Sequence, residues 1–306
     1  MSSFRSLVLA VARRPWVERF VRESPLVAPL VARFVAGEST EEALAVARAL
    51  ADRGFATTLD LLGEDVSAPT EAAAATEAYA ALLHAIARSG LDATVSVKPT
   101  HLGLRIDPDV ARLNLERLAR LAQRLGRRVE IDMEDSSTTR VTLELFAALH
   151  RSYGDHLQVA LQAYLYRSER DVQRAVEQGW RVRLVKGAYA EPVTVAYPTK
   201  AAVDAAYRRH LETLLEYGRF VAVATHDEAI LRVARGFARR LGIGPEKYEF
   251  QLLYGVRRDL QEGLRRAGEP VRIYVPFGRQ WYPYFTRRLA ERPANLLFLL
   301  RSVRQG

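Results

Sequence analysis

Short apolar runs alternate with longer amphipathic stretches along most of the chain. Eight runs rich in β-branched and aromatic residues, a composition typical of strands, are found at residues 55–62, 93–98, 128–133, 157–162, 181–187, 219–225, 247–253 and 271–277. The stretches between them carry hydrophobic residues at helical spacing, as in 71–90 and 198–218, and several end in glycine. The pattern therefore predicts strands and helices in strict alternation.

Strands joined by helical crossovers run parallel, and eight such units in about 250 residues fit a (β/α)8 barrel, the TIM-barrel fold. A doubly wound sheet is the alternative. Residues 59–66, LDLLGEDV, stand where that fold would place its glycine-rich phosphate turn. We therefore expect an α/β protein built on a (β/α)8 barrel.

The first residues follow a different pattern. Residues 1–36 are apolar and basic, and three prolines divide them into short helical pieces. A helix capped at Ser39 or Thr40 then begins the regular alternation. We expect a short helical N-terminal arm, residues 1–37, before a barrel domain of residues 38–306. The arm either packs on the barrel or forms an interfacial segment for a membrane or a partner.

Composition removes several classes of protein. With no cysteine, the chain has no disulfide framework, thiolate zinc site, iron–sulfur cluster or cysteine nucleophile. No metal site is expected. No apolar run approaches the roughly 20 residues of a membrane span, and arginines interrupt the N-terminus too early for a signal peptide. These features predict a cytoplasmic protein.

The net charge of +9 would suit nucleic acid, but its distribution does not. Arginines alternate with glutamates and apolar residues at helical spacing, as in 111–128, which indicates solvated helix faces. We expect no nucleic-acid partner. Lysine is rare: the chain has only four, so it is seldom used merely to carry charge, and two of the four follow predicted strands, Lys98 and Lys186.

Polar side chains stand at or near the ends of all eight predicted strands. In (β/α)8 barrels the C-terminal strand ends carry the chemistry, so these side chains should meet at one mouth. Structural alternatives stay open: Asp132 as a buried partner of an arginine, His226 as a helix cap, and Tyr274 as packing at the rim. The set comprises Asp60, Glu64, Lys98, Asp132, Glu134, Asp135, Gln162, Arg183, Lys186, Tyr189, Thr225, His226, Asp227, Glu249, Gln251 and Tyr274.

Six motifs in order along the chain resemble proline dehydrogenase. They are IDMEDS (131–136), LQAYLYRS (161–168), RLVKGAY (183–189), ATHD (224–227), EFQLLYG (249–255), and YVPFG (274–278) followed by WYPYFTRRLAERPAN (281–295). The resemblance covers residues 38–306 and suits the short monofunctional bacterial members. It implies a distorted (β/α)8 barrel that oxidises L-proline to Δ1-pyrroline-5-carboxylate, the first step of proline catabolism to glutamate.

The resemblance also implies residues for the substrate. Lys98, Arg287 and Arg288 would clamp the carboxylate, which guanidinium forks bind in bidentate fashion. Glu64 and Arg287 would form an ion-pair gate. The residues that would enclose the proline ring, or orient the arginines, are Leu253, Tyr274, Tyr284 and Glu291.

The cofactor implied by the resemblance is FAD, with a membrane quinone as electron acceptor and peripheral membrane contact through the arm, at the inner face of the cell membrane. Asp132 matches the active-site acid, and Arg183 would approach the flavin N5. Thr225 and His226 would hold the dinucleotide. The other residues along the flavin would be Met133, Gln162, Lys186, Gly187 and Ala188.

Three other functions stay open. A Schiff-base barrel aldolase would use Lys98 or Lys186 as a nucleophile. A flavin reductase of the methylenetetrahydrofolate type would share the fold and the cofactor. A non-catalytic membrane-surface module would rely on the arm alone, although it would have no use for polar strand ends.

Overall fold

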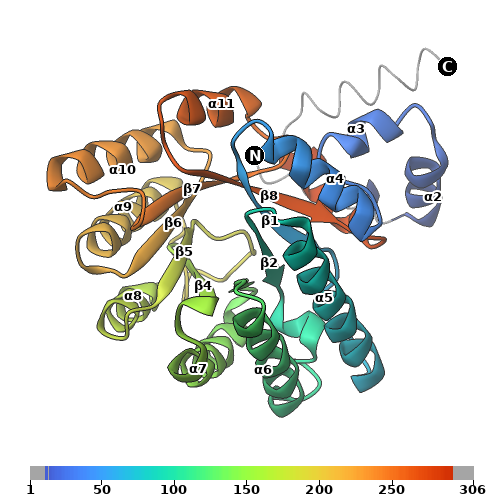
Figure 1. The fold of residues 1–306 in the computed structure, drawn as a ribbon, viewed down its shortest axis with the longest axis horizontal. Helices are drawn as coiled ribbons and strands as arrows, with labels where there is room; N and C mark the ends of the chain where they lie inside the picture. Colours follow the sequence, from blue (N-terminus) through green and yellow to red (C-terminus); the bar gives the residue numbers. More distant parts are fainter. Residues whose placement is uncertain (1–10, 13, 292–306) are drawn as a thin grey trace.

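The strands form a closed parallel barrel in which each strand pairs with the next and β1 pairs with β8 (Figure 1). The structure, a computed structural model, describes residues 11–12 and 14–291 of the 306. The expected (β/α)8 barrel is confirmed, and each strand lies within a predicted run. The strands are β1 Ala56–Leu61, β2 Ala93–Val97, β3 Val129–Ile131, β4 Leu157–Gln162, β5 Arg181–Val185, β6 Phe220–Ala224, β7 Tyr248–Leu253 and β8 Val271–Phe277.

Helices surround the barrel as an outer layer (Figure 1). The predicted helix start at Ser39 is confirmed: Ser39 Oγ accepts from the Glu42 N–H at 3.2 Å, and the Glu42 carboxylate accepts from the Ser39 N–H at 2.9 Å. Such a reciprocal cap stabilises a helix start by about 1 kcal/mol. The helices in this layer are α4 Thr40–Ala51, α5 Pro69–Ser89, α6 Pro108–Arg124, α7 Ser136–Tyr153, α8 Ser168–Glu177, α9 Lys200–Tyr217, α10 Glu228–Leu241 and α11 Arg258–Arg266. The short helices η1 Pro99–Leu102 and η2 Gly154–His156 belong to the connections, and α12 Trp281–Glu291 packs with the N-terminal arm.

The two faces of the sheet differ in chemistry. Outward-facing strand residues such as Val95, Val159 and Val223 are fully buried against the helices and form the main hydrophobic core. Inward-facing residues are largely polar and hydrogen-bond to one another across the barrel, where aliphatic side chains are usual. The main members of this inner network are Thr58, Thr94, Ser96, Glu130, Asp132, Arg183, Glu249, Gln251, Arg272 and Tyr274.

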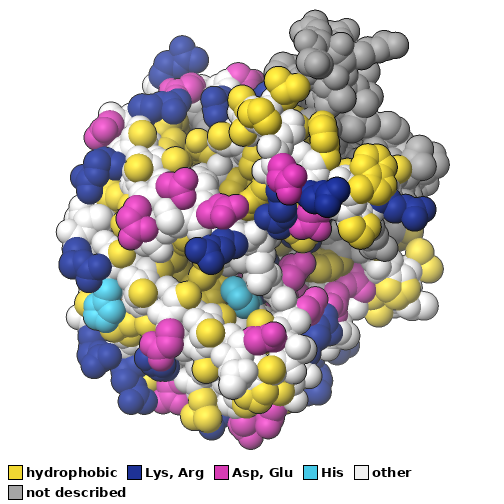
Figure 2. Space-filling model, turned by 90° about the vertical axis from the view of Figure 1, so that its right-hand side faces the viewer, with side chains coloured by type: hydrophobic (Ala, Val, Ile, Leu, Met, Phe, Trp, Pro, Cys, Tyr) yellow, Lys and Arg dark blue, Asp and Glu magenta, His cyan; other side chains and the backbone are white. Residues whose placement is uncertain are grey.

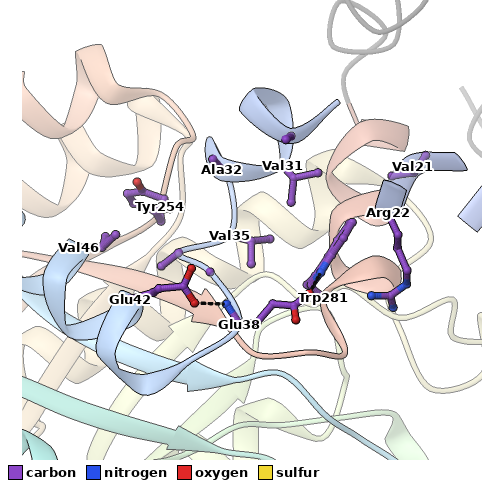
Figure 3. A pocket seen from close by; sticks show the side chains of 13 residues that line it. Val21, Arg22, Val31, Ala32, Val35, Glu38, Glu42, Val46, Tyr254 and Trp281 are labelled. Atoms are coloured by element: carbon purple, nitrogen blue, oxygen red, sulfur yellow. Dashed lines mark hydrogen bonds between the residues drawn. The ribbon is translucent and has the colours of Figure 1, made fainter. Parts of the chain in front are cut away.

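The described part of the N-terminal arm lies outside the barrel, beside α12. Its helices are α2 Pro15–Glu23 and α3 Ala28–Ala32. Val21, Val27, Leu30 and neighbouring residues form a second hydrophobic cluster with aromatic residues of α12. Between this arm, α4 and Trp281 lies a cavity of about 400 Å³ (Figure 3). The arm is therefore fastened to the barrel, which is the first of its two expected arrangements.

Large hydrophobic side chains nevertheless remain on the surface of the arm. They belong to Val11, Trp16, Phe20 and Leu26, of which Trp16 is 66% exposed. Figure 2 shows charges of both signs scattered over one face of the molecule, with hydrophobic side chains more frequent in its upper right part. Within the described residues, no helix is both long and apolar enough to span a bilayer.

Candidate active site

Lys98 and two carboxylates meet at the C-terminal end of the barrel, which we call the C-terminal mouth. Lys98 directly follows β2, and its Nζ lies 3.1 Å from Asp60 Oδ1 and 3.9 Å from Asp132 Oδ2. All three side chains are largely buried. Burial alone lowers the pKa of Lys98, but the charges of Asp60 and Asp132 outweigh it and raise that pKa above its ordinary value. The ammonium is thus held protonated, which disfavours a Schiff-base nucleophile.

Asp132 is the centre of the hydrogen bonds at this mouth. It follows β3 and accepts from Ser96 Oγ at 2.9 Å, from Tyr274 Oη at 2.7 Å and from the guanidinium of Arg183. Burial raises the pKa of Asp132 to about 6, although Lys98 acts in the opposite direction. Both expected roles of Asp132, as an arginine partner and as a group at the mouth, are therefore compatible with its position.

Arg183 is fixed from several sides inside the barrel. It forms ion pairs with Glu130 and Asp132, and its Nε donates to Gln251 Oε1 at 2.6 Å. Its guanidinium carbon lies 4.8 Å from the centroid of the Tyr274 ring. Burial lowers the pKa of Arg183, yet an arginine stays charged at neutral pH. The structure thus brings Lys98, Asp132, Arg183 and Tyr274 together.

A second buried carboxylate holds the short helix that follows Lys98. Glu134 accepts from the Thr100 N–H at 2.9 Å and from Thr100 Oγ1 at 2.6 Å. Burial raises the pKa of Glu134 to about 7 despite these hydrogen bonds. Glu134 therefore fastens η1, and with it the backbone of Lys98, to the end of β3.

The expected ion-pair gate is present as a contact. Arg287 Nη1, on α12, lies 3.2 Å from Glu64 Oε1 after β1, and both side chains are about one-third exposed, at 37% and 35%. The guanidinium of Arg288 lies 5.2 Å from the Tyr284 ring centroid on the same helix. The side chain of Glu291, expected to orient these arginines, lies outside the described part of the structure.

The residues expected along a flavin lie at the ends of β3 to β6. Gln162 Nε2 donates to the Glu134 carbonyl at 3.1 Å, while its buried Oε1 has no partner among the described residues. Met133, after β3, is also buried. Gly187 has φ +111°, and a Cβ at this position would lie 2.3 Å from the Tyr164 ring, so the backbone passes close to that ring. Ala188 follows in the same loop.

Lys186 is already paired in this structure. Its Nζ donates to Asp204 Oδ1 at 2.5 Å and to Asp227 Oδ2 at 2.8 Å. These carboxylates neutralise Lys186 and fix its position after β5. Any group that binds here meets an ammonium that is held in place by two carboxylates.

Thr225 and His226 follow β6, and the next residue, Asp227, caps helix α10. Asp227 accepts from the Ala229 N–H at 3.1 Å and so caps α10, whereas His226 Nε2 accepts from the Leu253 N–H at 3.1 Å. The alternative of His226 as the cap is therefore wrong: His226 links the ends of β6 and β7. Thr225 Oγ1 accepts from the Asp227 N–H at 3.2 Å.

A family model described as proline dehydrogenase matches residues 43–301. The chain belongs to the proline dehydrogenase family. The proline dehydrogenase of Deinococcus radiodurans is 42% identical over 99% of this chain and 98% of its own, and proline dehydrogenase 2 of Bacillus subtilis (strain 168) is 37% identical over 89% of each. A crystal structure of proline utilization A (PutA) from Bdellovibrio bacteriovorus, inactivated by N-propargylglycine, superimposes with a TM-score of 0.83 and 27% identity, covering 94% of this chain and 36% of that one.

The family assignment confirms the resemblance drawn from the motifs. It supports proline dehydrogenase activity, with proline as the substrate, over the aldolase, the folate reductase and the non-catalytic module. Proline dehydrogenases are flavoenzymes, and the mouth fits a flavin. Gln162 Oε1, without a partner among the described residues, is an acceptor suited to a ring N–H, and Arg183 and Lys186 are cations at fixed positions.

Sequence reasoning overlooked several residues of the inner network. Glu130 contacts Arg183 from below the mouth, and Ser96 donates to Asp132. Both stand inside strands, where a single polar residue usually faces solvent. Alternation was the available signal: in VEID, Glu130 and Asp132 must lie on one face of the strand.

Proposed function

We propose that this protein oxidises L-proline to Δ1-pyrroline-5-carboxylate with FAD as its cofactor and passes the electrons to a membrane quinone. The observation that carries this proposal is the cluster of Lys98, Asp132, Arg183 and Tyr274 at the C-terminal mouth of a chain of this family. A bound flavin would supply the acceptor for a hydride from C5 of proline.

The carboxylate of proline would bind to cations at the mouth. Lys98 offers an ammonium that is held protonated, and Arg287 and Arg288 offer planar guanidinium forks. Binding energy from this remote group orients the ring for the reaction. Leu253, Tyr274 and Tyr284 would enclose the ring. In the described structure Arg287 contacts Glu64, so substrate would bind beside an arginine that already has a fixed partner.

Asp132 would handle the proton of the substrate amine. With a pKa raised to about 6 by burial, it is mostly ionised at neutral pH and is a stronger base than an ordinary aspartate. Arg183 pairs with Oδ1 of this carboxylate and would face the flavin with its charge already balanced. Met133, Gln162, Lys186, Gly187, Ala188, Thr225 and His226 would hold the cofactor.

Quinone reduction would take place at a membrane surface, and the arm of residues 1–37 would bring the protein to that surface. The barrel domain, residues 38–306, would bind proline and the cofactor. Exposed Trp16 and Phe20 lie one helical turn apart on α2, and Arg19 belongs to the same helix. Aromatic residues with neighbouring cations suit the interface of an anionic bilayer. The support for this contact is the position of those side chains on the surface of a fastened arm.

One spectrum tests the proposal. The purified protein should absorb near about 450 nm, lose this band when L-proline is added without oxygen, and regain it with a soluble quinone. Acid extraction followed by chromatography would identify FAD against FMN. A colourless protein that does not take up flavin, or a flavin that L-proline does not bleach, would contradict the proposal.

A further inference from the structure

The opposite end of the barrel, the N-terminal mouth, is lined by three side chains that the chemistry above does not use. Gln158 belongs to β4, Arg181 begins β5, and Arg128 immediately precedes β3. Arg181 and Arg183 lie two residues apart, so they share the inward face of β5. The pairing of Val159 with Val182 places Gln158 beside Arg181, which is itself paired with Phe220.

Charge is not balanced at this mouth. Arg272 is satisfied by Glu249, at 2.9 Å, and by Asp92, at 3.2 Å, while Arg219 pairs with Asp155. These pairs occupy Glu249, Asp92 and Asp155, and Glu130, which lies beside Gln158 in the register of β3 and β4, pairs with Arg183.

Two arginines are left over. Arg128 reaches only the backbone carbonyl of Asp155, at 3.3 Å, and Arg181 lies with its guanidinium carbon 3.6 Å from the centroid of the Phe220 ring. Within the described residues, neither guanidinium forms an ion pair with a carboxylate. The two like charges also disfavour each other, because burial together with the charge of Arg128 lowers the pKa of Arg181 to about 10.

Arg181 and Gln158 are buried, whereas Arg128 is half-buried. Arg181 is only 8% exposed and Gln158 is 0% exposed. Arg181 Nε and both amide atoms of Gln158 have no hydrogen-bond partner in the described structure. Asp155 and Glu249 act on Arg181 only from a distance, and a buried cation without a direct ion-pair partner is unfavourable. Buried polar atoms without partners are likewise rare in folded proteins. Two of these atoms, Arg181 Nε and Gln158 Nε2, are donors, so the arginines and this amide nitrogen together lack an acceptor.

We propose that the N-terminal mouth of the barrel binds a small oxyanion of the phosphate class, held by Arg128 and Arg181 with the Gln158 amide as a third donor. Guanidinium forks match tetrahedral oxyanions in bidentate geometry, and the amide adds a neutral donor. Asp92 and Asp155 at the rim have side chains 74% and 45% exposed, so the rim of this mouth is in contact with solvent. The site lies at the far end of the barrel from Lys98 and Asp132, so it is separate from the proline site.

The test uses the flavin-loaded protein, so that no phosphate can enter a cofactor site. Inorganic phosphate is titrated by calorimetry at constant ionic strength, with chloride as the balancing ion. We expect saturable binding of one ion with a dissociation constant below about 1 mM, at least 10-fold weaker in Arg181→Gln and in Arg128→Gln. Arg140→Gln, at an exposed arginine of α7 that pairs with Glu144 of the same helix, is the control and should bind as the wild type does.

Two further measurements make the result decisive. Saturating L-proline should leave phosphate binding unchanged, because the two sites lie at opposite ends. Glycerol 3-phosphate in place of phosphate separates the sources: equal affinity identifies a phosphate monoester, and weak binding identifies the free ion.

Absence of saturable binding to the wild type would overturn the proposal. So would full affinity in both arginine variants, or displacement of phosphate by proline. If Arg181→Gln does not fold, Arg128→Gln, whose side chain is only half-buried, decides the question by itself.

Discussion

The two mouths of the barrel treat arginine in opposite ways. At the C-terminal mouth Arg183 contacts Glu130, Asp132 and Gln251, so its charge and its donors are satisfied within the chain. At the N-terminal mouth Arg181, two residues earlier on the same strand, lies over the Phe220 ring and forms no ion pair with any residue that the structure describes. One strand thus presents an ion-paired arginine at one end and, at the other, an arginine without a direct carboxylate partner among the described residues.

Each mouth is therefore suited to a different task. A guanidinium whose partners are all internal keeps its position whether or not a ligand is bound, which is what preorganised catalysis requires. A guanidinium without a counter-charge gains most from a ligand that brings one. The end of a barrel that usually serves stability alone therefore carries a second chemistry in this molecule.

Paired leucine substitutions test the contrast between these arginines most directly. Arg183→Leu leaves Glu130 buried without its partner, so we expect a loss of about 3–5 kcal/mol in the free energy of unfolding. Arg181→Leu removes an unpaired cation and should cost far less, or stabilise, in phosphate-free buffer. Urea unfolding of both variants measures the difference. Equal losses would show that the two arginines are in equivalent environments.

The two lysines after β2 and β5 should separate substrate from cofactor. Lys98→Met is expected to keep the flavin band and raise KM for proline at least about 10-fold, because an ion pair to the substrate carboxylate is lost. Lys186→Met should weaken flavin binding. Flavin content and steady-state kinetics distinguish these outcomes, with Arg140→Met, at an exposed arginine paired with Glu144 of its own helix, as the control. If the Lys98 variant is purified without flavin, Lys98 belongs to the cofactor site and its assignment to the substrate is wrong.

Arg287→Met should raise KM for proline about 10- to 150-fold, because one charge-assisted contact worth about 1.5–3 kcal/mol is lost. The flavin should stay bound. Arg112→Met, at a surface arginine of α6 paired only with carboxylates of its own helix, provides a comparison without effect on KM. An unchanged KM in the Arg287 variant would exclude this residue from the carboxylate clamp.

Protonation of Asp132 should govern the acidic limb of flavin reduction. Its pKa, raised from 3.8 to about 6 by burial, predicts a rate about 10-fold below the plateau at pH 5. The folded state binds the extra proton, so this residue's contribution to stability falls as the pH rises from about 4 to 6. Asp132→Asn should remove both this change in stability and the acidic limb of the flavin-reduction rate. Glu134→Gln is the control: burial raises the pKa of Glu134 to about 7, and its loss should leave the acidic limb of the rate near pH 6 in place. A limb that persists in Asp132→Asn would assign it elsewhere.

Glu64→Ala carries the smallest expected effect. An exposed salt bridge is worth under about 1 kcal/mol, so thermal stability should hardly change. If the contact with Arg287 acts as a gate, both KM and the rate of flavin reduction should suffer, and a double-mutant cycle with Arg287→Met should show non-additive losses. Additive losses would leave Glu64 as an ordinary rim charge.

The sequence predicted the fold well because alternation between strand and helix is local. Every strand lies inside a predicted run, and Lys98, Asp132 and Arg183 were found from the rule that strand ends carry chemistry. What could not be predicted depends on contacts across the barrel. Glu130 and Gln158 meet their neighbours only through the register of adjacent strands, and no local pattern specifies which arginine finds a carboxylate.

Closure of the barrel has a consequence for how this chain folds. Arg272 Nη1 donates to the Thr57 carbonyl across 215 residues of sequence, within the seam that joins β1 to β8. Contacts between such distant residues form slowly, since a long loop must be ordered before they are made. During synthesis β1 emerges long before its partner and exposes an unpaired edge, a template for wrong pairing. We therefore expect the chain to be prone to aggregation until β1 pairs with β8. Dependence on chaperones should be strongest before this pairing forms.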